Sequence, residues 1–162
     1  MLAPKLIVSP IDFSEPSLQA LDTAADLAVR YQADLLLIHA VPVIAKLPAD
    51  VSIFKEHDYE RELIRDAQSR LDELAKDLTK KGVRARTQVG LANDAAMEVI
   101  RAAEDAHADL IVIATHGMTG WRRLAFGSVT EKIVRTASCP VLVLRQQAHA
   151  AEQAHPASAA AS

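Results

Sequence analysis

Residues 109–131 have the sequence DLIVIATHGMTGWRRLAFGSVTE, in which a short apolar run is followed by a glycine-containing loop and then by a helix start. The apolar run at 109–113 is typical of a buried strand. Ser128 and Glu131 have the spacing of a capping box, which predicts that a helix begins at Ser128. The first backbone N–H groups of a helix lack intrahelical partners, and the helix dipole favours an anion near them. The stretch therefore predicts a strand, a phosphate-binding loop and a helix.

The rest of the chain repeats this alternation of strand and helix. Apolar runs closed by turn residues predict five strands, at 6–8, 33–41, 83–89, 109–113 and 140–145. Between them the sequence predicts a helix that starts after Ser14, a loop at 42–54, a long helix over 63–78 that ends at Gly82, a helix capped by Asn93, and a helix over 128–137. Such alternation predicts an α/β fold, with a parallel sheet covered by helices on both faces. Ligands of these sheets lie beyond the carboxyl ends of the strands, where the strand order reverses.

The loop has a specific glycine spacing. Two residues separate Ala114 from Gly117, nine separate Gly117 from Gly127, and a serine follows at once. This pattern resembles the nucleotide-binding signature of the universal stress protein family, which has glycine where this chain has Ala114. The resemblance extends from residues 4–14 to residues 139–144. It implies a single-domain sheet with the Rossmann-like strand order 3-2-1-4-5, an adenine nucleotide alpha hydrolase-like fold, and binding of ATP together with Mg²⁺ or Mn²⁺.

The resemblance also implies which positions hold the nucleotide. Backbone N–H and hydroxyl groups would hold the phosphates and ribose at Gly117, Gly127, Ser128, Val129 and Thr130. The candidates at the strand ends are Pro10, Asp12, Ala40, Ile113 and Ala114. Among these, Asp12 would contact the adenosine half, and Ala40 and Ile113 would line the adenine pocket.

Several residues of the predicted site also have a structural interpretation that involves no ligand. Asp12 is then only a turn residue that satisfies local N–H groups. Gly127 and Ser128 are then an ordinary turn and helix cap. Arg122 and Arg123 in the loop could add charge to a triphosphate or could simply face solvent.

The composition narrows the class of protein. The chain has 162 residues, and we expect one domain at 1–145 followed by a disordered tail at 146–162. A net charge of −3 with 24% charged residues argues against a nucleic-acid partner. The single Cys139 excludes an internal disulfide and a metal site built on thiolates. Neither a secretion signal nor an apolar run near the ~20 residues of a membrane span is present, so we expect a cytoplasmic protein.

Motifs of common catalytic sites are missing. The chain has no GxSxG elbow, no GxxxxGK[ST] loop and no GxGxxG fingerprint. His39 and His116 have no carboxylate or cysteine at the spacing of a metal site, so we interpret them as packed or loop-bonded side chains. We therefore expect an ATP-binding stress or signalling module rather than a turnover enzyme. The alternatives are a dimeric interaction protein without nucleotide, which Ala114 favours, and a slow ATPase or phosphotransferase.

The last predicted strand is continuously apolar from Pro140 to Leu144, and no later helix is predicted to cover it. Exposed apolar edges aggregate unless they are covered. Pairing with the same strand of a second copy, about a two-fold axis, would cover this edge. We therefore expect a homodimer formed through this strand, which the family resemblance also implies.

Overall fold

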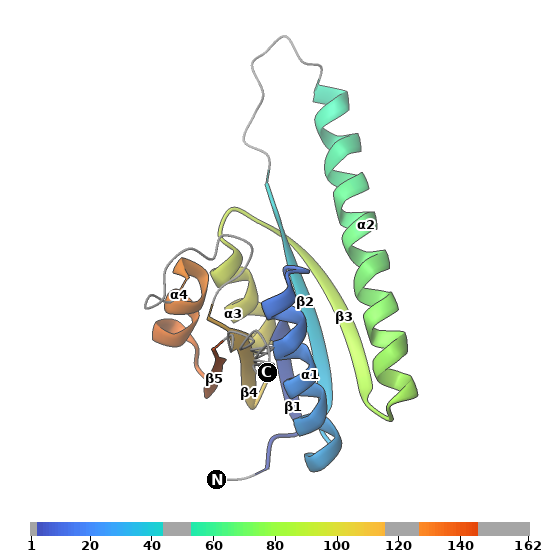
Figure 1. The fold of residues 1–162 in the computed structure, drawn as a ribbon. Coiled ribbons are helices and arrows are strands. Elements are labelled where there is room, and N and C mark those ends of the chain that lie inside the picture. Colours follow the sequence, from blue (N-terminus) through green and yellow to red (C-terminus); the bar gives the residue numbers. More distant parts are fainter. Residues whose placement is uncertain (1–2, 44–52, 116–126, 146–162) are drawn as a thin grey trace, which may run out of the picture.

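The computed structural model describes residues 3–43, 53–115 and 127–145, and the expected tail at 146–162 lies outside these ranges. The described residues contain a sheet of parallel strands in the order β3-β2-β1-β4-β5 (Figure 1). The strands are β1 (Leu6–Pro10), β2 (Asp34–Pro42), β3 (Arg84–Ala92), β4 (Leu110–Ala114) and β5 (Val141–Leu144). The predicted fold class and strand order are therefore confirmed.

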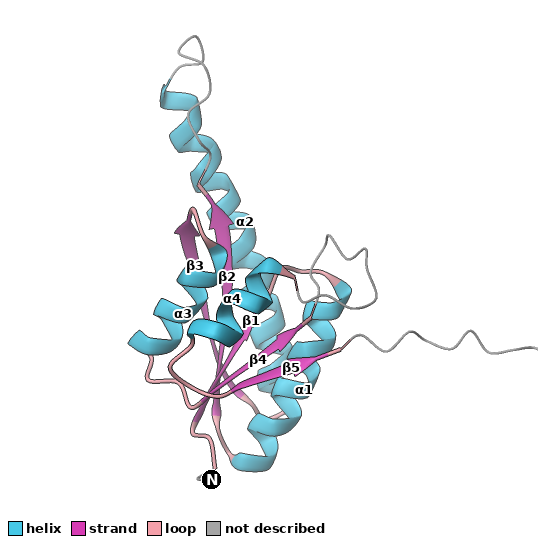
Figure 2. Cartoon of the chain, turned by 90° about the vertical axis from the view of Figure 1, so that its left-hand side faces the viewer, coloured by secondary structure: helices cyan, strands magenta, loops and turns pink. Residues whose placement is uncertain are grey.

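Helices cover both faces of this sheet, as the view in Figure 2 shows. They are α1 (Glu15–Tyr31), α2 (Ile53–Lys80), α3 (Ala95–Asp105) and α4 (Ser128–Thr136). One buried cluster joins α1 and α2 to Ile7 and Leu35, and a second joins α3 and α4 to Val8 and Ile38. Because successive side chains of a strand point to opposite faces, the neighbours Ile7 and Val8 enter different clusters. Burial on both faces explains why β1 and β2 are rich in apolar residues.

β1 lies between β2 and β4, so the first and fourth strands are neighbours, as predicted. Ile7 pairs with Leu110, and Val8 pairs with Ile111. The chain proceeds from β1 outward to β2 and β3, and then returns to β4 and β5 on the other side. The strand order therefore reverses between β1 and β4, where a ligand site is expected.

The ends of α1 and α2 follow local sequence signals. α1 begins after Ser14, whose hydroxyl oxygen accepts a hydrogen bond from the Ser17 backbone N–H. α2 ends at Lys80 and is followed by Gly82, whose φ of 85° is the left-handed conformation that commonly ends a helix. None of the helices in the described ranges combines the length and the hydropathy that a membrane span needs.

Three elements are longer than the sequence predicts, and the first is β1, which extends to Pro10. α2 begins at Ile53, so residues 53 and 54 belong to a helix and not to the predicted loop. The first part of α2 extends beyond the sheet (Figure 1). A helix is predicted from the apolar side chains that it packs on the core, and a part of the helix outside the core does not need them. β3 continues to Ala92 because it pairs along the whole of β2, up to the pair of Pro42 with Ala92.

The predicted cap of α3 is wrong by one residue, whereas the predicted start of α4 at Ser128 is confirmed. α3 is capped by Asp94 and not by Asn93, since the Asp94 carboxylate accepts from the N–H groups of Ala96 and Met97. Gly127 is the N-cap of α4, so Ser128 is the first residue of the helix and not its cap. Sequence patterns place a helix start only to within one or two residues.

Candidate functional site

A pocket of about 290 Å³ opens at the carboxyl edge of the sheet, over the ends of β1, β2 and β4. The starts of α1, α3 and α4 surround it. Its lining is Pro10, Ile11, Asp12, Ser17, Ile38, His39, Ala40, Ala95, Val99, Ile113, Ala114, Gly127, Ser128, Val129 and Thr130. Every predicted site residue except Gly117 is in this lining, and Gly117, Arg122 and Arg123 lie outside the described residues. The fold thus brings candidates from distant parts of the sequence into one pocket.

The strand ends form an apolar floor. Ile38 and Ile113 are buried in the core cluster on the side of α3 and α4. Ala40 adds a small apolar side chain to the lining. The Ile11 N–H donates to the carbonyl oxygen of Ile38 at 2.8 Å, which holds the chain beyond β1 against β2. The flat face of a ring can lie on such a floor.

The start of α4 forms a polar side of the pocket. The Gly127 N–H donates to the carbonyl oxygen of Thr115 at 2.9 Å, and the buried Thr130 hydroxyl donates to the carbonyl oxygen of Ala114 at 2.9 Å. These bonds fix the first turn of α4 against the end of β4. Because Gly127 has no side chain that could cap the helix, the first N–H groups of α4 have capacity for an anion.

The backbone at Gly127 does not require glycine. Its φ of −59° and ψ of 150° can be adopted by any residue. Among the described residues, an added Cβ would meet only the carbonyl oxygen of Thr115, at the ordinary distance of 3.4 Å. Ala114 likewise has no positive φ, so alanine in place of the family's glycine causes no backbone strain there. Gly127 is also one of the residues that line the pocket.

Asp12 is a turn residue and also lines the pocket. Its Oδ1 accepts hydrogen bonds from the Ser14 N–H at 3.0 Å and from the Ser14 hydroxyl. Ser14 in turn caps α1. The turn therefore fixes the orientation of the Asp12 carboxylate at the edge of the pocket.

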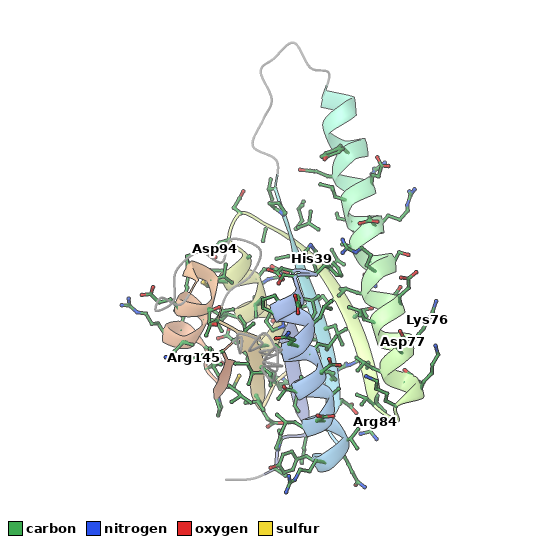
Figure 3. The ribbon with its side chains drawn as sticks, in the orientation of Figure 1. His39, Lys76, Asp77, Arg84, Asp94 and Arg145 are labelled. Carbon is green, nitrogen blue, oxygen red and sulfur yellow. The ribbon has the colours of Figure 1, made fainter. Side chains whose placement is uncertain are left out.

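His39 is packed, as its sequence context predicts. Its Nδ1 lies 2.7 Å from the carbonyl oxygen of Ile11, and its ring centroid lies 4.8 Å from that of Phe13. Figure 3 shows His39 close to the start of α1. His116 lies outside the described residues.

Several lining residues were not predicted from the sequence. Besides His39, these include Ser17 in the first turn of α1 and Ala95 and Val99 in the first turns of α3. No chemical signal marks these small or apolar residues. Their position near a helix start or strand end was the only available signal, because the carboxyl ends of parallel strands and the starts of the following helices meet at one edge.

An ion pair connects two walls of the pocket. Asp94, labelled in Figure 3, is the N-cap of α3 and precedes the lining residue Ala95. Its carboxylate pairs with the Lys132 ammonium group of α4. The hydrogen bond from Lys132, followed by that from the Met97 N–H, lowers the pKa of the Asp94 carboxyl. Lys132 lies one turn after Ser128, so the pair connects the starts of the two helices.

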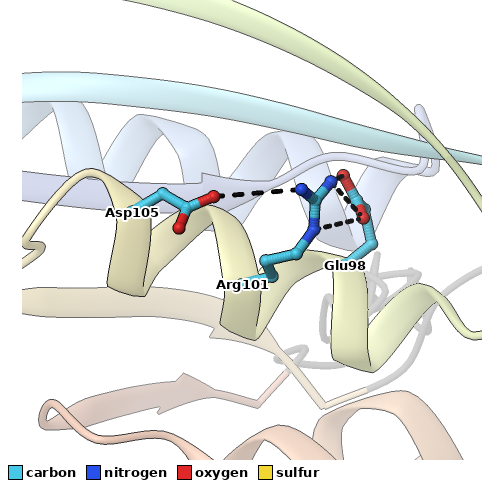
Figure 4. A network of polar contacts seen from close by, with 3 residues as sticks. All are labelled: Glu98, Arg101 and Asp105. Carbon is cyan, nitrogen blue, oxygen red and sulfur yellow. Dashed lines mark hydrogen bonds and ion pairs between the residues drawn. The ribbon is translucent and has the colours of Figure 1, made fainter.

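A second ion pair lies behind the α3 wall. The buried Glu98 carboxylate accepts from the exposed Arg101 guanidinium at 2.6 Å, and Arg101 also lies 3.9 Å from Asp105 (Figure 4). A Cβ on Gly90 would collide with the Glu98 side chain. Gly90 pairs with Ala40 in the floor of the pocket. The glycine therefore allows α3 to approach the sheet beside the pocket.

Comparison with known proteins places this architecture in a family. The model of the Universal stress protein family matches residues 4–145. Universal stress protein MJ0531 from Methanocaldococcus jannaschii is 36% identical over 145 residues, which span 88% of this chain and 82% of that protein. Universal stress protein YxiE from Bacillus subtilis is 31% identical over 148 residues, which span 87% of this chain and 98% of that protein.

Solved structures share the fold. Universal stress protein UspA from Lactobacillus plantarum matches with a TM-score of 0.79 at 22% identity, over 90% of this chain and 100% of the other. A universal stress protein in complex with cAMP has a TM-score of 0.64 at 20% identity, and one from Archaeoglobus fulgidus in complex with dAMP has 0.62 at 19%. Both of these matches cover 88% of this chain and 98% of the other. Since the family model spans nearly the whole of the described structure, the chain belongs to the universal stress protein family.

Proposed function

We propose that this universal stress protein binds ATP in the pocket at the carboxyl edge of the sheet and acts as a nucleotide-responsive stress or signalling module. The observation that carries the proposal is that the described positions of the nucleotide-binding signature line one pocket, where the strand order reverses. Proteins with the same fold bind cAMP and dAMP, which supports an adenine nucleotide as the class of ligand.

The chemistry of the lining suggests how the nucleotide lies. The phosphates lie at the start of α4, where N–H groups without intrahelical partners and the helix dipole favour an anion. The adenine ring lies on the apolar floor near Ala40 and Ile113. The Asp12 carboxylate accepts hydrogen bonds from the adenosine half.

We also propose that Mg²⁺ or Mn²⁺ accompanies the triphosphate. Across residues 3–43, 53–115 and 127–145, no three His, Cys, Asp or Glu side chains converge as metal ligands would. A divalent ion that neutralises a nucleotide does not need such a cage, because it is bound largely by phosphate oxygens and water with one or two carboxylates.

The alternative hypothesis, a dimeric interaction protein that binds no nucleotide, is based on Ala114. Because Ala114 has no positive φ and its carbonyl oxygen accepts from Thr130, the alanine is compatible with an ordered helix start. This observation supports retention of the site.

We further propose a homodimer formed through β5. This strand lies at the edge of the sheet, next to β4. Leu142 in β5 is 37% exposed, and Val134 in the contacting α4 is 44% exposed. A second copy would cover this apolar edge.

Replacement of Gly127 by Val tests the proposed site. The extended backbone at this position accepts a β-branched residue. Because Gly127 lines the pocket, we infer that the added methyl groups occupy space that a phosphate needs. We expect the ATP affinity measured by calorimetry to fall at least about tenfold, which corresponds to ~1.4 kcal/mol. Gly127→Ala is the matched control and should have a smaller effect, because its Cβ makes only an ordinary contact.

Thermal unfolding of each variant shows whether it is folded. A folded Gly127→Val variant with unchanged ATP affinity would contradict the site. Chromatography of the same samples distinguishes binding from turnover, since a slow ATPase or phosphotransferase would accumulate ADP.

A further inference from the structure

Phe13 has an unusual backbone conformation for an aromatic residue. Its φ of 62° lies in the left-handed region, where a Cβ crowds the backbone and glycine or asparagine is preferred. Phe13 lies in the turn between β1 and α1, after Asp12 and before the N-cap Ser14. Contacts elsewhere in the structure must offset the cost of this conformation.

The Phe13 ring contacts side chains from two other elements. The Cζ atom of Arg70, in α2, lies 3.8 Å from the ring centroid. The His39 ring, in β2, lies 4.8 Å away with an angle of 44° between the ring planes. A guanidinium over an aromatic face is attracted by the ring quadrupole. These three residues, Arg70, Phe13 and His39, are called the aromatic stack below.

The aromatic stack adjoins the pocket. His39 lines the pocket, and its Nδ1 lies within hydrogen-bond distance of the Ile11 carbonyl oxygen. Phe13 itself is outside the lining, but Asp12, which precedes it, is in the lining and accepts from the Ser14 N–H at 3.0 Å. A change in the backbone of Phe13 would therefore move Asp12 relative to the pocket.

We propose that the aromatic stack is a positioning device that fixes Asp12 at the pocket and connects it to α2. This inference rests on the proposed binding of ATP in that pocket. Without the ring or the guanidinium, the backbone of Phe13 can leave the left-handed region, which rotates the turn formed by Asp12 and Ser14. Phe13 and Arg70 are thus positioning residues for the adenosine half, although neither lines the pocket.

Single substitutions separate the parts of the aromatic stack. Phe13→Leu removes the ring, and Phe13→Tyr retains it. Arg70→Met removes the guanidinium and retains an unbranched stem. Arg65→Met is the matched control, because Arg65 is another exposed arginine of α2. Asp66→Asn controls for the ion pair of Arg70 with Asp66, in which the charged atoms are 3.9 Å apart.

Calorimetry with adenosine and with ATP measures the effect on binding. We expect Phe13→Leu and Arg70→Met to weaken both ligands by the same factor, about three- to tenfold, and the other three variants to stay within about twofold of the wild type. Gly127→Val should instead weaken ATP more than adenosine, because it acts on the phosphates. A purely structural role would lower the unfolding temperature and leave the affinity of the folded protein unchanged.

Amide hydrogen exchange tests the same inference without ligand. The Ser14 N–H, which donates to Asp12, should exchange faster in Arg70→Met than in Arg65→Met. Equal exchange rates, or wild-type affinities in folded Phe13→Leu and Arg70→Met, would overturn this inference alone. If the wild type bound neither adenosine nor ATP, the proposed function would fail, and the role of the stack in binding would fail with it. Arg70 is exposed, so Arg70→Met provides the test even if Phe13→Leu does not fold.

Discussion

Gly127 and Phe13 each have a backbone conformation that their residue type does not explain. Gly127 adopts a conformation open to any residue, whereas Phe13 adopts one that favours glycine. We infer that Gly127 is needed for the space it leaves in the pocket and Phe13 for the contacts of its ring. Gly127 was predicted as a site residue from the spacing of the glycine motif. The conformation of Phe13 could not be predicted, because it depends on contacts with β2 and α2 and not on its neighbours in sequence.

Substitutions of Phe13 test its left-handed conformation directly. Both Phe13→Ala and Phe13→Gly remove the ring, but alanine keeps a Cβ that is strained at a φ of 62°. We expect the glycine variant to be the more stable of the two by roughly 1 kcal/mol. Urea unfolding measures the difference. Greater stability of the alanine variant, which is usual in ordinary backbone, would show that position 13 does not hold a left-handed conformation in solution.

The sequence predicted which helices and strands exist better than where they begin. The cap of α1 at Ser14 was identified because serine, glutamate and proline occur together there. The cap of α3 was missed by one residue because Asn93 and Asp94 are both good caps, and only the three-dimensional structure shows that Asp94 also pairs with Lys132. The same limit applies to lining residues such as Ala95, whose role follows from where its helix starts.

The charge of Asp94 should make stability depend on pH. The pKa of its carboxyl is lowered from the ordinary 3.8, chiefly by Lys132. A group whose pKa is lower in the folded state stabilises the fold above its unfolded value, and this contribution is lost as the pH falls through the folded value. We expect wild type to unfold at a higher temperature than Asp94→Asn at neutral pH, and the difference to shrink as the pH falls below 3.8.

Asparagine retains the side-chain oxygen that caps α3 and removes the charge, which strengthens both the Lys132 ion pair and the hydrogen bonds from the α3 N–H groups. Asp94→Ala also removes the cap and should be less stable than Asp94→Asn at neutral pH. If the difference between wild type and Asp94→Asn stayed constant from neutral to acidic pH, the ion pair with Lys132 would not contribute to stability.

The alternation of strands and helices along the chain was sufficient to predict a parallel sheet covered on both faces. Right-handed crossovers and burial on both faces leave few arrangements for such an alternation. The strand order came from the family resemblance, since no local pattern specifies which strands are neighbours. The full length of β3 could not be predicted, because it depends on the pairing of β3 with β2.

Substitution in β5 tests the proposed homodimer. Leu142 is exposed at the sheet edge, whereas Val143 packs against the core, so a charge at position 142 disturbs the edge with less effect on folding. We expect Leu142→Lys to place like charges near the two-fold axis and to shift the protein towards monomer in light scattering. Val29→Lys is the control, because Val29 is 53% exposed on α1. A wild type that remains monomeric at micromolar concentration would contradict the dimer without any variant.

Mass spectrometry of the folded wild type under non-denaturing conditions, after addition of ATP and Mg²⁺, is a direct test of ATP binding by this protein. We expect a species carrying a single adenine nucleotide per chain, and a smaller fraction of this species in Gly127→Val, because the proposed site has the phosphates at the start of α4. A wild-type protein that carries no adenine nucleotide under these conditions would contradict the proposed binding of ATP.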